Sequence, residues 1–332
     1  MGRVVRIVSL LIVAAASALP SFAQTRKPTN EEWDLVKPLF KLVESVAAGQ
    51  PAPADLTLSW QCHFLNADAG VVFVPFTLKI DRGELTSFPV AMYVRVVVHG
   101  APAPAPGPKD PLAQYPFEDA AVLDDVKDGR ITRAFTAPAG DYDVYVALSE
   151  KPDAAAPQPK TVVYKQTVQV PDLKSALATS SIIVADRIEI DPRNRRLNIE
   201  EQLDEPYAWW GNKLTPALRT RYGRSEKLSV IFLVYNTAAR DDDKPDVEVQ
   251  YNVYKRAAGA ADAFINSAPP EMFNGGTLRR EFSQAAGDLI IAGRQVPLSR
   301  FADGDYRLVI TVADRIKNAS ITRDVSFTVA GP

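Results

Sequence analysis

The chain has 332 residues, of which 38 are basic and 40 are acidic, and this near balance excludes the basic excess that nucleic-acid-binding proteins carry. Hydrophobic residues make up 46% of it, and its length is enough for two domains that each bury a core. A single cysteine excludes the disulfide framework on which small exported domains often depend.

Residues 1–23 have the pattern of a signal peptide. Arg3 and Arg6 precede an apolar run, and small residues stand before a cleavage position after Ala23. The run is too short for a membrane span, which needs roughly 20 apolar residues, and no later stretch approaches that length. We therefore expect an exported protein, periplasmic or secreted, whose mature chain has no membrane span.

Residues 24–54 are expected to form a helix followed by a proline-rich lead. Thr29 and Glu32 have the spacing of a capping box, and apolar residues then recur every three or four positions up to Ala48. Pro38 lies inside this segment, and we expect it to kink or split the helix. The amphipathic pattern predicts a helix that packs on the first domain or one that binds a partner.

Residues 55–172 form the first predicted domain. Its expected strands are short and separated by turn signals: 56–65, 71–80, 90–99, 118–126, 130–136, 142–149 and 161–170. In the first strand, Trp60 and Cys62 lie on one face and His63 lies on the other. We interpret Cys62 as a buried hydrophobic residue, since a catalytic thiolate needs an exposed electropositive setting and a paired base.

A linker is predicted at 173–180, followed by the second domain at 181–332. Its expected strands are 182–190, 228–236, 247–255, 278–282, 289–296, 306–314 and 321–329. The strand 247–255 alternates apolar and polar residues. This alternation is typical of a strand with one face in the core and one in water.

A repeated phrase connects the two domains. Gly140-Asp141-Tyr142 and Gly304-Asp305-Tyr306 each lead into a strand with alternating apolar residues. A tyrosine in this position is typical of the tyrosine corner of immunoglobulin-like sandwiches, in which the phenol bonds to nearby backbone. We expect an all-β protein of two immunoglobulin-like antiparallel sandwiches in tandem, preceded by a short amphipathic helix.

Short motifs in both halves carry a resemblance to a known family. The segment 301–314, with 323–329 behind it, is similar to the closing strands of bacterial immunoglobulin-like modules in exported proteins. Residues 74–77 (Val-Pro-Phe-Thr), 170–173 (Val-Pro-Asp-Leu) and 180–186 resemble segments of large secreted acidobacterial proteins that combine such modules with von Willebrand A-type domains. The resemblance implies sandwich modules over most of 56–330, whereas the Asp-x-Ser-x-Ser metal motif of an A-type domain does not occur in the sequence.

An aromatic segment is the first candidate binding site. Tyr207, Trp209 and Trp210 stand in a stretch that no strand pattern covers. Exposed planar side chains there could stack on sugar rings or anchor a protein partner. The alternative is that they cap the open end of a sandwich, since large aromatic residues are usually buried.

An acidic loop is the second candidate. Asp241, Asp242, Asp243 and Asp246 lie between two predicted strands and could collect oxygen ligands for calcium. The order of an EF-hand loop is absent, so a solvated hairpin loop is the default interpretation. In a sandwich this loop should lie near Arg315 and Lys317, which would reduce the need for a metal.

The remaining chemistry of the sequence favours no reaction. Two histidines and one cysteine, without paired spacing, do not indicate a zinc site or a catalytic triad, and we expect no cofactor. We therefore predict a non-enzymatic interaction or envelope-scaffold protein that binds a protein partner. A carbohydrate-binding module with the aromatic platform is the alternative, and a carboxylate-dependent hydrolase is a distant one.

Overall fold

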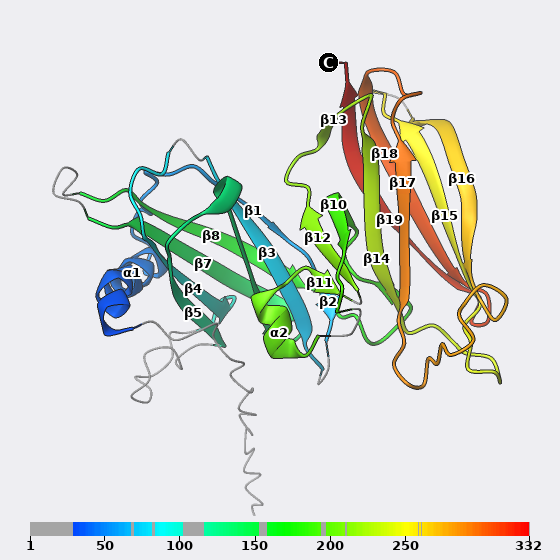
Figure 1. Ribbon diagram of the computed structural model, residues 1–332, viewed down its shortest axis with the longest axis horizontal. Coiled ribbons are helices and arrows are strands. Elements are labelled where there is room, and N and C mark those ends of the chain that lie inside the picture. Colours follow the sequence, from blue (N-terminus) through cyan, green and yellow to red (C-terminus); the bar gives the residue numbers. More distant parts are fainter. Residues whose placement is uncertain are drawn as a thin grey trace, which may run out of the picture.

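The computed structural model describes residues 29–67, 70–81, 84–101, 116–152, 158–193, 197–209, 211–257, 259 and 261–331. The predicted signal peptide and its cleavage position lie outside these residues. The described chain is mostly strand, and it folds into two sandwiches that lie side by side, with helix α1 on the side of the first that faces away from the second (Figure 1).

Helix α1 (Asn30–Ala47) begins with the expected capping box. The Thr29 hydroxyl accepts a bond from the Glu32 amide at 3.3 Å, and the Glu32 carboxylate accepts one from the Thr29 amide at 2.6 Å. Contrary to expectation, Pro38 does not split the helix. Pro38 is exposed, so the carbonyl group that it leaves without a helical donor lies on the side that faces water.

Sandwich 1 consists of two antiparallel sheets. Its short sheet contains β1 (Leu58–Cys62), β3 (Val72–Ile80) and β6 (Arg130–Ala137), with β2 (Leu65–Asn66) also paired to β3. Its long sheet has the order β5 (Phe117–Leu123), β4 (Val90–Val98), β7 (Gly140–Glu150) and β8 (Thr161–Val170), and a 3₁₀ turn, η2 (Lys127–Gly129), precedes β6. These strands match the predicted ones to within a few residues.

Sandwich 2 repeats this arrangement. Its short sheet contains β10 (Ile183–Ile190), β14 (Lys227–Tyr235) and β17 (Ile290–Pro297). Its long sheet has the order β16 (Ala263–Phe273), β15 (Val247–Lys255), β18 (Gly304–Asp314) and β19 (Ala319–Ala330). Taken in chain order, corresponding strands of the two sandwiches occupy the same sheets, which is the strand order of an immunoglobulin-like sandwich.

One predicted strand of the second half is wrong. Residues 278–282 form turns, and the fourth strand of sandwich 2 is β16 instead. Pro269 and Pro270 within β16 conceal it in the sequence. Proline is tolerated there because β16 is an edge strand, which needs backbone donors on one side only.

The phrase shared by the two halves has the same geometry in both. Gly140 lies opposite Val170 and Gly304 lies opposite Val329, each at the start of a strand and with φ angles of 152° and 144°. A glycine suits these positions because residues with a side chain rarely adopt such angles. The two sandwiches can therefore be aligned residue by residue along β7 and β18.

Sandwich 2 carries extra elements between β10 and β14. They are α2 (Ile199–Asp204), β11 (Ala208–Trp209), β12 (Asn212–Pro216) and β13 (Arg221–Gly223). We call α2, β11 and β12 together the insertion. β12 pairs with the second half of β10, whereas β13 runs parallel to β19. The predicted linker is partly structured, since β9 (Ala178–Thr179) pairs with β14.

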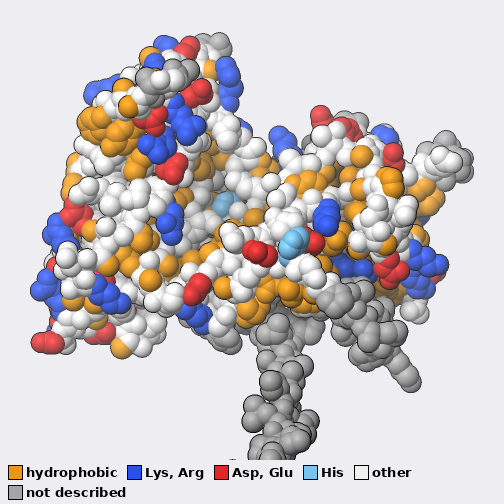
Figure 2. Space-filling view, turned by 180° about the vertical axis from the view of Figure 1, so that it is seen from behind, with side chains coloured by type: hydrophobic (Ala, Val, Ile, Leu, Met, Phe, Trp, Pro, Cys, Tyr) orange, Lys and Arg blue, Asp and Glu red, His pale blue; other side chains and the backbone are white. Residues whose placement is uncertain are grey.

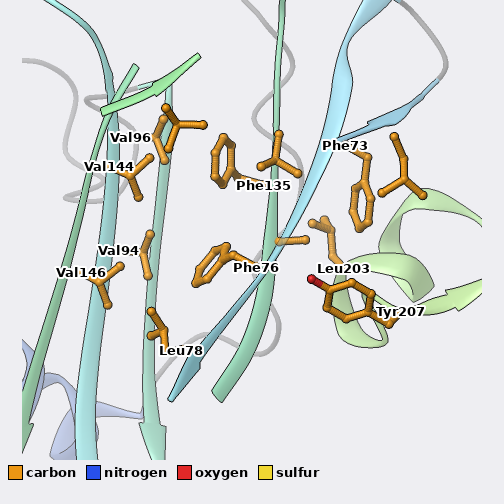
Figure 3. Close-up of a cluster of buried hydrophobic side chains, with 14 of the residues drawn as sticks. Phe73, Phe76, Leu78, Val94, Val96, Phe135, Val144, Val146, Leu203 and Tyr207 are labelled. Carbon is orange, nitrogen blue, oxygen red and sulfur yellow. The ribbon is translucent and has the colours of Figure 1, made fainter. Parts of the chain in front are cut away.

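Buried side chains fill both faces of the short sheet of sandwich 1. On one face of β3, Phe76 and Leu78 contact the long sheet and form the core between the sheets (Figure 3). On the other face, Phe73 lies next to Leu203, which belongs to α2, and Tyr207, which lies between α2 and β11 (Figure 3). One hydrophobic cluster thus runs from the interior of sandwich 1 into sandwich 2.

Candidate functional site

The aromatic segment lies in the joint between the sandwiches. Only 4% of Tyr207 and 3% of Trp209 is exposed, and both belong to the cluster that joins β3 to β14. The expectation of an exposed aromatic platform is therefore wrong for these two residues. Trp210 lies outside the described residues.

A hydrogen-bond chain fixes Tyr207 against sandwich 1. Its hydroxyl lies 2.7 Å from His63 Nδ1 and donates to the Pro75 carbonyl oxygen at 3.3 Å. The arrangement that uses each proton once has His63 Nδ1–H donating to Tyr207. Burial raises the pKa of Tyr207 and lowers the pKa of His63 to about 4, so both groups are neutral at pH 7.

Backbone contacts complete this joint. The Phe64 amide donates to the Ser181 hydroxyl at 2.8 Å, and the Ser181 amide donates to the Phe64 carbonyl oxygen at 3.0 Å. Arg130 of β6 donates to the Pro216 carbonyl oxygen at 2.8 Å and pairs with Asp186 at 3.3 Å. These contacts make the junction a packed interface instead of a ligand site.

The acidic loop provides its own cation. The Lys244 ammonium is buried and donates to the carbonyl oxygens of Arg280, at 2.9 Å, and Phe282. Asp246 pairs with Arg240, and Asp243 accepts bonds from the Ser283 hydroxyl, at 2.6 Å, and the Ala285 amide.

The four candidate aspartates do not converge on a common point. Asp242 accepts a bond from the Lys244 amide at 3.2 Å. The described residues contain no group of three or more histidine, cysteine or acidic side chains that could hold a metal. Arg315 lies beside the loop as expected, since its amide donates to the Asp246 carbonyl oxygen at 2.9 Å. The expectation of a hairpin loop is wrong, because β14 and β15 belong to different sheets and the loop crosses from one sheet to the other. Lys244 and Arg240 are the cations that stabilise it.

The tyrosine corner is formed in one sandwich. Tyr306 donates to the Ala302 carbonyl oxygen at 2.7 Å, as the pattern predicts. For Tyr142 the described part of the chain shows no such bond, although its ring packs against Gly140 at 3.6 Å from the position that a Cβ atom would take. The repeated phrase therefore preserves the backbone turn in both sandwiches and the hydroxyl bond only in the second.

The residues of β1 and His63, which follows it, lie as their alternation predicts. Trp60 and Cys62 pack against the core of sandwich 1, and His63 faces the joint. Burial raises the pKa of the Cys62 thiol to about 11, so the thiol is protonated at neutral pH. The other histidine, His99, lies 3.0 Å from Asp143, which also accepts a bond from Thr167 at 2.8 Å.

An edge strand with exposed hydrophobic residues is one that sequence reasoning missed. β16 is the edge of the long sheet of sandwich 2, and 58% of Phe264 and 46% of Ile265 is exposed there. Figure 2 shows hydrophobic side chains on the outer edge of this sandwich, among interspersed basic and acidic ones. The phrase Ala263-Phe264-Ile265 was the available signal in the sequence.

β16 has a bulge at Phe264 and Ile265. Tyr254 lies opposite Phe264 and Val253 lies opposite Asn266, so Ile265 has no partner residue on β15. The Phe264 ring packs edge to face on Tyr254, with 5.7 Å between centroids, and Arg307 lies over the Tyr254 ring. We call Tyr254, Phe264 and Ile265 the edge patch.

No helix among the described residues is long and apolar enough to cross a membrane. No family model matches the chain, and no curated protein matches it.

Solved structures give distant matches. Dimeric latent PorU from Porphyromonas gingivalis is 10% identical, with 84% of this chain and 21% of that chain covered and a TM-score of 0.29. Alpha-2-macroglobulin of Salmonella, reacted with methylamine, is 12% identical, with 84% and 17% covered and a TM-score of 0.21. Trypsin-activated alpha-2-macroglobulin of Escherichia coli is 11% identical, with 85% and 17% covered and a TM-score of 0.24. The chain spans about a fifth of these proteins or less, and likenesses this weak carry no argument about activity.

Proposed function

We propose that the protein is an exported, non-enzymatic scaffold that binds a protein partner through the edge patch of sandwich 2. The observation that carries this proposal is an unprotected edge strand with two exposed large hydrophobic side chains, Phe264 and Ile265. Exposed edges of this kind are templates for strand addition by another chain.

The second half of β16 is protected against strand addition, which supports the choice of its first half as the binding site. Natural edge strands are blunted by prolines, charges or a covering element. The second half of β16 has Pro269, Pro270 and Glu271, whereas the stretch 263–267 has no proline and no charge. In sandwich 1 the corresponding edge strand, β5, is contacted by α1. The stretch 263–267 therefore lacks the prolines and charge that protect the second half of the same strand.

The carbohydrate-binding alternative is not supported by Tyr207 and Trp209, the two described residues of its proposed aromatic platform. Sugar recognition by stacking needs an open ring face, and the rings of Tyr207 and Trp209 are buried in the joint. Binding of the wild-type chain on a glycan array would revive this alternative against the scaffold.

Affinity capture with a matched surface variant tests the proposal. Residues 24–332 would be immobilised as wild type, Phe264→Lys and Ile190→Lys and exposed to an envelope extract, with retained proteins quantified by mass spectrometry. Ile190 is 86% exposed on β10, so its variant makes the same chemical change away from the edge patch. We expect one partner to be retained by wild type and Ile190→Lys and lost about tenfold or more with Phe264→Lys, which corresponds to roughly 1.4 kcal/mol. Equal retention by all three chains would contradict the proposal.

A further inference from the structure

Sandwich 1 has a cleft along one side, where its two sheets are open to solvent between β1 and β8. The cleft has a volume of about 330 Å³. Trp60, Cys62 and Phe64 line it on the β1 side, and Gln166, Val168 and Gln169 line it on the β8 side. Each of these side chains is uncharged at neutral pH, so the cleft suits an uncharged ligand.

The backbone of β8 is free along this cleft. At its start, β8 is covered by the preceding chain, since the Val163 amide donates to the Pro53 carbonyl oxygen at 3.0 Å and the Asp55 amide donates to Thr161 at 3.1 Å. Beyond Val163, none of the described segments pairs with this edge of β8. Because alternate amides of a strand point the same way, the amides of Thr167 and Gln169 face outward like that of Val163.

Sandwich 2 shows what fills the same position. There β13 runs parallel to β19, and the Thr328 amide donates to the Thr220 carbonyl oxygen at 2.8 Å. Tyr222 of β13 points into the core and is 3% exposed. Thr328 corresponds to Gln169 of sandwich 1, because Thr328 lies opposite Asp305 and Gln169 lies opposite Asp141.

We propose that the cleft of sandwich 1 binds an extended, uncharged peptide segment of a partner protein, which adds to β8 as a parallel strand in the way that β13 adds to β19. The Gln169 amide donates to the peptide backbone, as Thr328 does to Thr220. One aromatic or large aliphatic side chain of the peptide points inward into the cleft, as Tyr222 points into the core of sandwich 2.

The aromatic residue of the cleft favours a peptide over a sugar. The Trp60 indole is stacked on Phe76, with 4.4 Å between centroids, and on Tyr164, at 6.3 Å, and is within 23° of parallel to each. It is thus engaged by neighbouring rings and does not offer the open face that sugar stacking requires. The free backbone amides supply affinity for an added strand, and the cleft selects the side chain that enters it.

A proline substitution tests the backbone bond without a change in the core. Gln169→Pro removes the outward amide, and proline is tolerated on an edge strand when its nitrogen faces away from the neighbouring strand. Gln169→Ala keeps the amide and serves as the matched control, and Thr167→Pro is a second variant one repeat along the edge. Thermal unfolding would establish that each variant is folded.

The probe is a phage-displayed library of random linear heptapeptides, selected on wild-type residues 24–332. Selected peptides would be synthesised and their Kd values measured by fluorescence anisotropy. We expect one aromatic or aliphatic position to recur, and binding to weaken about tenfold with Gln169→Pro or Thr167→Pro and less than about twofold with Gln169→Ala, as loss of a backbone bond and a steric clash predict.

A second readout locates the peptide. Cys62 is the only cysteine of the chain and lines the cleft, so bound peptide should slow its alkylation by N-ethylmaleimide at least fivefold, by analogy with ligand protection of a buried group. Selection without binding peptides, equal Kd values for the proline and alanine variants, or unchanged alkylation would overturn the proposal. Peptides whose binding fails with Phe264→Lys and persists with Gln169→Pro would place recognition at the edge patch, and would thereby support the scaffold proposal while overturning this one.

Discussion

The two sandwiches share strand order and register, but they differ in what covers their outer faces. In sandwich 1, α1 packs on the long sheet and the insertion packs on the short sheet. In sandwich 2, the outer face of the long sheet has no such cover among the described residues, and its side chains are half-buried or exposed. Ala147 of β7 is fully buried, whereas Thr311, its counterpart on β18, is half-buried. The same strand order can therefore form a long sheet that is buried on both faces, as in sandwich 1, or one that is buried on its inner face only, as in sandwich 2.

An aspartate introduced at Ala147 or at Thr311 should give the largest difference between the sandwiches in the free energy of unfolding. Ala147→Asp would bury a carboxylate beneath α1, and we expect it to lower the free energy of unfolding by roughly 5 kcal/mol or to detach the helix. Thr311→Asp should cost less than about 0.5 kcal/mol, as expected for a surface substitution. Urea unfolding followed by circular dichroism measures both values. Similar losses at the two positions would contradict the comparison.

Truncation of the joint should have the next largest effect. Trp209→Ala removes a ring from the cluster shared by the sandwiches, and we expect a loss of about 4 kcal/mol. Its cost should fall on the coupling of the two halves, so unfolding followed by fluorescence and by circular dichroism should separate into two transitions. Ile190→Ala, an exposed change on the same side of sandwich 2, is the control and should change stability by less than about 0.5 kcal/mol.

The joint also predicts a dependence on pH. The pKa of His63 falls from 6.5 to about 4 on folding because burial disfavours the charged imidazole. The unfolded chain then binds more protons below pH 6.5, so stability is retained above 6.5 and declines as the pH falls from 6.5 to 4. The decline is about 3 kcal/mol, at 1.4 kcal/mol for each pKa unit.

Comparison with His63→Gln isolates this contribution from the acidic groups that titrate in the same range. Wild type should lose more stability than His63→Gln between pH 7 and pH 4, because only wild type has the buried imidazole to protonate. Parallel pH profiles for wild type and His63→Gln would contradict the assignment.

The smallest expected effect concerns the tyrosine corners. Tyr306→Phe removes the bond to Ala302, and we expect a loss of about 1 kcal/mol. Tyr142→Phe should cost less, since the described residues offer its hydroxyl no bond. The ordering of the two melting temperatures checks this, and a larger loss for Tyr142→Phe would reverse the contrast between the sandwiches.

Most of the strand pattern could be predicted because the core strands alternate or are continuously apolar. The predicted strand 161–170 has the same bounds as β8. β16 was missed because an edge strand hydrogen-bonds to one neighbour only and therefore tolerates Pro269 and Pro270, which conceal it in the sequence. The start of α2 was also missed, although Asn198 and Glu201 form a capping box that the sequence displays.

The fate of the aromatic segment needed the tertiary structure. Tyr207 is buried because the short sheet of sandwich 1 presents Phe73 and Pro75 on its outer face, and a strand pattern does not say which segment will cover such a face. A signal for some cover was present: β3 is apolar on both faces, whereas β15 alternates. The phrase Ala263-Phe264-Ile265 signals an apolar segment, but the exposure of Phe264 could not be predicted from it, since that depends on β16 having no outer neighbour.

The insertion has a mechanical consequence. It leaves sandwich 2 between β10 and β14 and returns to it, so both of its ends are anchored in the domain from which it reaches across. In Figure 1 helix α1 lies on the far side of sandwich 1, and the C-terminus lies at the top of sandwich 2. A tensile load applied between helix α1 and the C-terminus would pass through the joint, because the joint connects the two sandwiches.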